Sequence, residues 1–146
     1  RAPGGRGAYP THRPPPDHPS ITATAWAAPA LKAYHTPGRA AEIKSRLALA
    51  GEYLRHTKAS GVEELAMRLI GLAATDLPVS DAVRELLAAQ NRDGSWSQLP
   101  NMPADAYATG LALYALVTAA DMKPSAPPYQ QAVGRLLKTQ FPDGSW

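Results

Sequence analysis

The amino-acid sequence predicts an all-α fold made of about three repeated helical hairpins. A shift of fifty residues aligns AVRELLAAQNRDGSW (82–96) with AVGRLLKTQFPDGSW (132–146), and nine of the fifteen positions are identical. The apolar residues that the two copies share have the i, i+1, i+4, i+5 spacing of one helix face, so each copy ends an amphipathic helix. A second helical segment precedes each copy. Self-similarity at a fixed period is typical of a repeat architecture, here one built from hairpins.

Residues 1–19 are expected to form a proline- and glycine-rich linker. They contain six prolines and three glycines, and they carry a net charge of +2 from Arg1, Arg6 and Arg13 against Asp17. A segment so poor in apolar side chains cannot offset its ordering entropy by burial. The α-hairpin repeat domain is therefore expected to cover residues 20–146.

The first hairpin is predicted to be a degenerate copy, with helices at Thr22–Tyr34 and Arg39–His56. Its segment ITATAWAAPAL (21–31) aligns with AYATGLALYAL (106–116), which pairs Thr24, Ala27, Ala30 and Leu31 with Thr109, Ala112, Ala115 and Leu116. Pro29 is expected to bend or break the first helix near Ala25, because it removes a backbone donor and clashes with that carbonyl. Thr36 is the expected N-cap of the second helix, with Pro37 at its first position.

The other two hairpins begin with helices expected at Val62–Ala74 and Ala104–Ala120. Ser60 and Glu63 have the spacing of a capping box, and Ser80 is the expected cap of the next helix. The turn in LPNMP (99–103) separates the second hairpin from the third. Pro127 and Pro128 stand where the first turn of the last helix tolerates proline.

Two copies of the motif QxxDGSW end the last two hairpins. The first motif comprises Gln90, Asp93, Gly94 and Trp96, and the second motif comprises Gln140, Asp143, Gly144 and Trp146. Asp-Gly is turn chemistry, since glycine supplies the positive φ that ends a helix. The glutamine amide is expected to bond the free carbonyls at the helix end, and the tryptophan to cover the next hairpin. Each motif is thus interpreted as a staple between neighbouring hairpins.

These motifs resemble the QW motifs of the squalene-hopene cyclase and prenyltransferase repeat superfamily, and the chain is similar to bacterial repeat proteins of that group. The resemblance covers residues 20–146 and includes ADAYATG (104–110). It implies an α/α toroid of inner and outer helices, of which three hairpins would form a partial toroid with an unfinished edge. The chain is accordingly expected to be a fragment, joined to the rest of a larger polypeptide or to another protein chain.

Catalysis is not expected within this segment. Class II terpene cyclases protonate their substrate with a DxDD motif ahead of an inner helix, and the resemblance places Asp105, Ala106, Tyr107 and Ala108 at that position. Only Asp105 matches, so it is a weak catalytic candidate, and the N-cap of the helix is its favoured role. The chain has no cysteine, which excludes the thiolate zinc site of protein prenyltransferases and a cysteine nucleophile within these residues.

Cofactors, metals and nucleic acid are not expected either. The four histidines, His12, His18, His35 and His56, show no metal-ligand spacing. Residues 20–146 carry 12 basic and 11 acidic side chains, so the body is nearly neutral and has no basic patch. The longest apolar run, Tyr107 to Ala120, is shorter than the roughly 18 residues of a transmembrane helix.

Four aromatic residues on the expected inner helices, Trp26, Tyr34, Tyr107 and Tyr114, suggest either core packing, which is favoured, or the lining of an apolar cavity. The favoured function is a non-catalytic scaffold or binding module for a hydrophobic ligand or protein partner. The alternative is part of a terpene-cyclase-like enzyme whose acidic motif lies outside this chain. The compartment stays open, with a preference for the bacterial periplasm or secretion.

Overall fold

A computed structural model describes residues 19–34 and 36–146, and the all-α prediction is confirmed for this part of the chain. Most of the expected linker, together with His12, His18 and His35, lies outside the described residues. The six α-helices described are α1 (Pro19–Ala33), α2 (Ala40–His56), α3 (Val62–Ala74), α4 (Ser80–Ala88), α5 (Ala106–Ala120) and α6 (Pro127–Thr139). A 3-10 turn, η1 (Pro37–Arg39), precedes α2, and two-residue strands β1 (Trp96–Ser97) and β2 (Ala104–Asp105) pair antiparallel.

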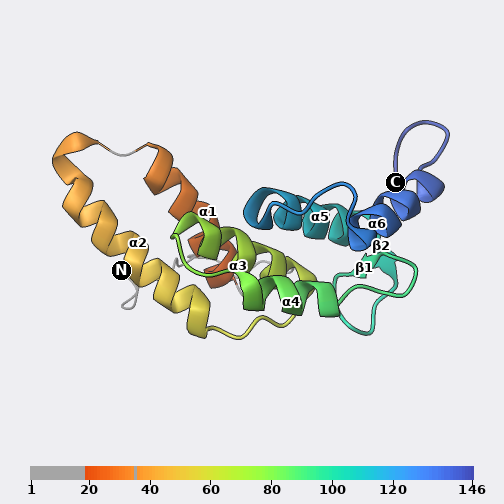
Figure 1. Ribbon diagram of the computed structural model, residues 1–146, viewed down its shortest axis with the longest axis horizontal. Coiled ribbons are helices and arrows are strands. Elements are labelled where there is room, and N and C mark those ends of the chain that lie inside the picture. The colour runs from red at the N-terminus through yellow and green to blue at the C-terminus, as the bar shows by residue number, and fades with distance from the viewer. Residues whose placement is uncertain (1–18, 35) are drawn as a thin grey trace.

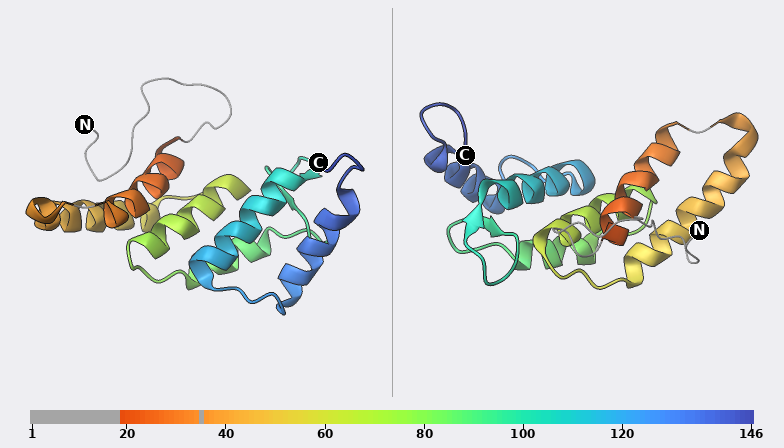
Figure 2. Two further views of the ribbon diagram at one scale, coloured as in Figure 1. Left: turned by 90° about the horizontal axis from the view of Figure 1, so that it is seen from above. Right: turned by 180° about the vertical axis from the view of Figure 1, so that it is seen from behind.

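The three hairpins follow one another along the longest axis of the molecule, from α1 and α2 at one end to α6 at the other (Figure 1). Helix α3 packs between α1 and α5, so the first helices of the hairpins lie side by side, as expected (Figure 2). The Thr22 hydroxyl donates to Glu63 at 3.3 Å near the starts of α1 and α3. Lys32 pairs with Asp76 at 2.7 Å near their ends, which shows that the two helices run parallel.

Small residues allow the hairpins to approach closely. A Cβ atom on Gly71 of α3 would lie 3.1 Å from the Ala25 Cα atom of α1 and 2.4 Å from the Leu54 Cδ1 atom of α2. Since a real side chain cannot approach that closely, the packing of α3 on the first hairpin depends on this glycine. The core then continues through Leu69, Leu86, Trp96 and Leu116, which are all buried.

An ion pair between a buried arginine and a half-exposed glutamate joins α3 to its neighbours. The Arg68 guanidinium is buried, donates to the Glu85 carboxylate of α4, and also donates to the Thr57 carbonyl at 3.2 Å. Arg68 Nε has no hydrogen-bond partner among the described residues. A buried charge of this kind needs its partners, because an isolated one would carry a large desolvation penalty.

Several expected details at the helix starts are wrong. The backbone amide and hydroxyl of Ser60 bond Glu64, at 2.7 and 2.8 Å, instead of the predicted Glu63. Glu63 instead accepts from the Thr22 hydroxyl of α1. This donor belongs to the neighbouring hairpin, so the sequence around Glu63 does not predict it. Ser80 is the first residue of α4 and does not cap it, and Thr36 precedes a 3-10 turn without a side-chain cap.

Of the predicted bend or break at Pro29, the break is wrong, because α1 is one continuous helix from Pro19 to Ala33. Proline removes one hydrogen bond from the helix interior and costs roughly 3 kcal/mol there. Ile21, Ala25 and Ala28 are buried on the side of α1 that meets the second hairpin and α2. Tertiary packing of this kind supplies most of the stability of a helix in a protein, and it overrides the local preference.

Candidate functional site

The two motifs fold into loops with the same internal bonds. Gly94 has φ of +87° and Gly144 has φ of +89°, as predicted for the turn that ends each helix. Asp93 accepts from the backbone amide of Ser95 at 3.1 Å and from its hydroxyl. Asp143 accepts from Ser145 in the same way, at 3.0 and 2.8 Å. The loop geometry is therefore set by the local sequence.

The tryptophan, and not the glutamine, bonds the helix-end carbonyl. The indole N–H of Trp96 donates to the Leu86 carbonyl at 2.8 Å, and that of Trp146 donates to the Leu136 carbonyl at 2.9 Å. These carbonyls belong to the last turns of α4 and α6, and they also accept from backbone amides, that of Ala89 at 3.3 Å and that of Gln140 at 3.1 Å. The expectation that the glutamine bonds these carbonyls is thus wrong. The indole N–H bonds them instead, because the large tryptophan side chain extends back to the last turn of the helix.

The glutamine of the first motif links the second hairpin to the third. The Gln90 side-chain amide donates to the Gly94 carbonyl at 3.0 Å within its own loop and to the Pro128 carbonyl at 3.0 Å at the start of α6. The backbone of Gly94 lies against Gln131 of the same helix, so that a Cβ atom on this glycine would be 2.6 Å from the backbone of Gln131. Trp96 is fully buried between the hairpins. This is the geometry of a staple between hairpins.

Thr109 on α5 is a motif partner that the sequence analysis did not identify. Its hydroxyl accepts from the backbone amide of Trp96 at 3.0 Å and donates to the Asp105 carbonyl at 2.7 Å. The internal alignment did contain a signal, because it pairs Thr24 with Thr109, and both are buried. A threonine that recurs on an alanine-rich helix face indicates a hydrogen-bonding role for its hydroxyl.

The second motif has the same loop, but no hairpin of the described residues covers it. Gln140 donates to the Gly144 carbonyl at 2.8 Å, as Gln90 does in its own loop. Trp146 is 54% exposed, whereas Trp96 is 0% exposed. A Cβ atom on Gly144 would meet no atom within 4 Å. The second motif therefore presents an open surface where the first presents a filled one.

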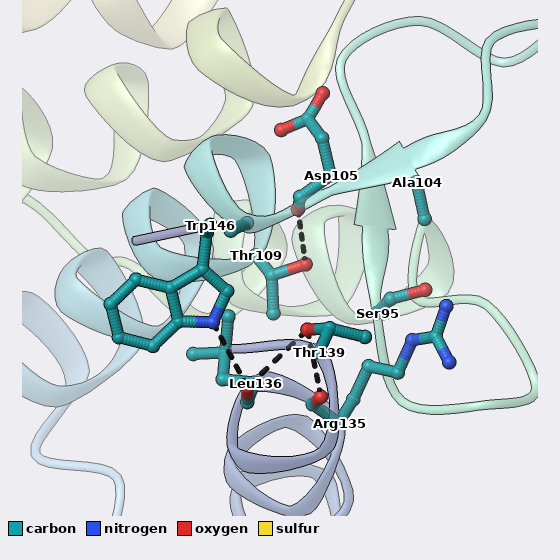
Figure 3. Close-up of a pocket in the computed structure, with 9 residues that line it drawn as sticks. Ser95, Ala104, Asp105, Thr109, Arg135, Leu136, Thr139 and Trp146 are labelled. Carbon is teal, nitrogen blue, oxygen red and sulfur yellow. Dashed lines mark hydrogen bonds between the residues drawn. The ribbon is translucent and has the colours of Figure 1, made fainter. Parts of the chain in front are cut away.

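A pocket of about 190 Å³ separates the two motifs (Figure 3). Trp146 forms one wall, and Arg135, Leu136 and Thr139 of α6 form another (Figure 3). The remaining lining comes from Ser95, Ala104, Asp105, Ala106 and Thr109.

Asp105 lines this pocket as a structural residue, and its carboxylate points away from Trp146 and Arg135 (Figure 3). One carboxylate oxygen accepts from the Ala108 amide at 2.7 Å, which makes Asp105 the N-cap of α5, as expected. The other oxygen accepts from the Gln98 side chain at 2.8 Å. Both carboxylate oxygens of Asp105 thus take part in structural hydrogen bonds.

The four aromatic side chains singled out in the sequence are exposed and are not part of the core. Trp26, Tyr34, Tyr107 and Tyr114 all face outward, so the favoured expectation of core packing is wrong. The reason is that, on the faces that meet other helices, α1 buries isoleucine and alanine and α5 buries alanine and leucine. None of the four lines the 190 Å³ pocket. Partial burial, followed by the charges of Glu63 and Asp105, raises the pKa of Tyr107.

The motif aspartates have lowered pKa values. Hydrogen bonds from the Ser95 side chain and backbone lower the pKa of Asp93, and the Arg135 guanidinium, 3.4 Å away, lowers it further. Hydrogen bonds from the Ser145 backbone and side chain lower the pKa of Asp143. The serine hydrogen bonds of the loop lower the pKa of both aspartates. Arg135 lowers only the pKa of Asp93, because α6 covers the first motif.

The described residues contain no group of three His, Cys, Asp or Glu side chains that could hold a metal ion. His56, the one histidine that they include, lies 3.3 Å from Glu52 on α2. Within the same ranges, no helix is both long and apolar enough to cross a membrane. No protein-family model matches the chain, and no curated protein matches it either.

Proposed function

We propose that this chain is a non-catalytic segment of helical hairpin repeats, related to the QW-repeat proteins and forming an arc of an α/α toroid. It acts as a scaffold or binding module for a hydrophobic ligand or protein partner. The observation that carries the proposal is the first motif, in which Gln90 and Trp96 join one hairpin to the next through bonds to Pro128 and Thr109. A repeated staple of this kind builds an extended surface from nearest-neighbour contacts.

The exposed aromatic face of the first helices supports the binding role. Tyr107, Tyr114 and Val117 follow one another along α5 at helical spacing and are exposed, and Trp26 is exposed on α1. Since α1, α3 and α5 lie in one row, these side chains belong to the same layer of helices. Exposed apolar patches on soluble proteins mark binding surfaces, and aromatic rings suit an isoprenoid or a lipid tail.

The state of Asp105 supports the absence of catalysis. Both of its carboxylate oxygens are engaged in structural hydrogen bonds, one from the Ala108 amide at the start of α5 and one from the Gln98 side chain. The positions two and three residues further on hold Tyr107 and Ala108, which are not carboxylic acids. No second carboxyl group thus stands in the motif to hold a proton beside the first.

Two measurements test the proposal. Incubation of the chain with squalene should give no cyclised product by mass spectrometry, and turnover that is lost in Asp105→Asn would refute the non-catalytic role. Titration with farnesol, followed by calorimetry, should show binding that weakens in the Tyr107→Ala, Tyr114→Ala double variant. Leu49→Ala, an exposed apolar position on α2, is the matched control. Equal binding by the double variant and the control would refute the aromatic face as the binding surface.

A further inference from the structure

We infer that the aromatic face of the first helices prefers a ligand with a positively charged head group, an alkylammonium ion, and that Glu63 of α3 binds this head group. The inference rests on the binding role proposed for that face, and it names the chemical class of the ligand. A neutral isoprenoid or lipid tail would occupy the same face without using the carboxylate.

Glu63 lies at the start of α3, between the aromatic side chains of α1 and α5. Its carboxylate accepts from the Thr22 hydroxyl of α1 at 3.3 Å. Trp26, which is exposed, follows Thr22 by about one turn of α1. On the other side, partial burial raises the pKa of Tyr107, and the charges of Glu63 and Asp105 raise it further. The Glu63 carboxylate therefore stands beside exposed aromatic surface on both of its flanks.

The Glu63 carboxylate has no cationic partner. It is half-buried, and it forms no ion pair with a lysine or arginine of residues 19–34 and 36–146. Its one hydroxyl donor is 3.3 Å away, which is long for a hydrogen bond between two oxygens. A partly desolvated carboxylate is costly beside apolar surface, and a charge-assisted bond to a cation offsets that cost. Glu63 is thus suited to bind a positively charged group.

The basic side chains of α1, α3 and α5 lie away from the start of this face. Lys32 of α1 is near the far end of the row and pairs with Asp76 at 2.7 Å. Arg68 of α3 is buried and donates to Glu85 of α4. Helix α5 contains no basic residue. An anionic head group would therefore meet the carboxylate of Glu63, whereas an ammonium group would complete an ion pair with it.

The aromatic rings favour the same class of ligand. The face of a tryptophan or tyrosine ring has a negative electrostatic potential, which attracts an ammonium ion. Trp26 is 56% exposed and Tyr107 is 58% exposed, so ring surface is accessible to a ligand. A hydrocarbon tail would continue along α5 over Tyr114, about two turns beyond Tyr107. A cationic amphiphile matches both the charged start of the face and its apolar continuation.

Calorimetric titration with probes of equal chain length tests the inference. The probes are decyltrimethylammonium, decanol and decanoate, each used below the concentration at which it forms micelles. The cation should bind about tenfold more tightly than decanol, as expected for an ammonium group beside a carboxylate and aromatic rings. Decanoate should bind most weakly, although the net charge of +3 on the chain would favour an anion by non-specific attraction.

Glu63→Gln removes the charge and keeps an oxygen that can accept from Thr22. This variant should lose the tenfold preference for the cation and retain the wild-type affinity for decanol, which verifies that the face is intact. Glu52→Gln removes an exposed carboxylate of α2 and is the matched control, so it should keep the preference. Circular dichroism verifies that both variants keep their helix content.

The outcomes separate this inference from the proposed function. Binding of decanol without a preference for the cation, or a preference that persists in Glu63→Gln, would overturn the inference and leave the proposed binding face standing. A loss of decanol affinity in Glu63→Gln would show a structural role for Glu63 and would also overturn it. Binding of none of the probes by the wild type would refute the binding face itself.

Discussion

At the scale of single residues, the two motifs are a controlled comparison within one molecule. Gly94 and Gly144 have almost the same φ, and Asp93 and Asp143 accept the same serine bonds. What differs is the neighbour, since α6 covers the first loop and leaves the second open. Substitutions at matched positions therefore separate the local cost of a residue from its tertiary cost.

Gly94→Ala should destabilise the protein more than Gly144→Ala. Both substitutions place an L side chain at positive φ, which costs roughly 1–2 kcal/mol. At Gly94 the new Cβ would also lie 2.6 Å from the backbone of Gln131, which adds about 1–3 kcal/mol of overpacking. Urea unfolding midpoints measure the difference, and Gly134→Ala in α6, where a Cβ meets nothing within 4 Å, should be neutral or stabilising. Equal losses at Gly94 and Gly144 would show that Gln131 yields easily.

The pKa values of Asp93 and Asp143 should both lie below the ordinary value of about 3.9. Because the folded pKa is depressed, the stabilisation is complete above that ordinary value and is lost as the pH falls through the lowered one. Carboxyl-carbon NMR titration measures both sites. Ser95→Ala should raise the pKa of Asp93 and leave that of Asp143 unchanged, and Ser145→Ala should do the reverse. An Asp93 pKa that does not respond to Ser95→Ala would contradict the assigned cause.

At the scale of helices and loops, the tryptophan combines two functions. Its ring covers apolar surface, and its N–H bonds a carbonyl in the last turn of the helix that ends at the motif. The second function is local and occurs in both motifs. The first depends on a following hairpin, and among the described residues only the first motif has one.

Trp96→Ala should cost about 3–5 kcal/mol of folding free energy, as is typical for truncation of a buried tryptophan. Trp146→Ala should cost far less, because the side chain is already half exposed. Trp96→Phe keeps much of the apolar contact but loses the bond to the Leu86 carbonyl, and should cost about 1 kcal/mol from that bond in addition to any cavity. Denaturant midpoints at low protein concentration measure all three. Equal losses for the two alanine variants would refute the staple interpretation.

Asp105 should behave as a helix cap. Asp105→Ala should destabilise the protein by about 1 kcal/mol, whereas Asp105→Asn, which keeps a capping oxygen, should cost only a few tenths of that. Thermal unfolding of the two variants measures the difference. A large loss in Asp105→Asn would instead point to a role for the negative charge.

At the scale of the whole molecule, stability should follow position in the row of hairpins. Helix α3 contains the buried Arg68 and has neighbouring helices on both sides. Helix α6 and the second motif have neighbouring helices on one side. Native-state hydrogen exchange should therefore find the slowest amides in α3 and the facing part of α5. The fastest helical amides should lie in the last turn of α6 and the first turn of α2. Uniform protection along the chain would contradict a stability built from nearest-neighbour interfaces.

The sequence by itself determined the features whose causes are local. The helical hairpins, the two Asp-Gly loops and the Asp105 cap were predictable, because each depends on bonds within a few residues. The internal repeat also predicted which segments are equivalent.

Only the tertiary structure decided how equivalent residues differ. Trp96 and Trp146 end the same seven-residue motif, yet one is buried and the other is exposed. The difference arises because Trp96 and its strand β1 contact α5 of the following hairpin. Tertiary contacts also decide the partner of Glu63, which accepts from Thr22 of α1 and does not bond Ser60. They likewise decide the exposure of Tyr107 and Tyr114, because α5 packs closely on α3 through alanines. Local bonds are encoded by neighbours in sequence, but burial is a property of the whole assembly of helices.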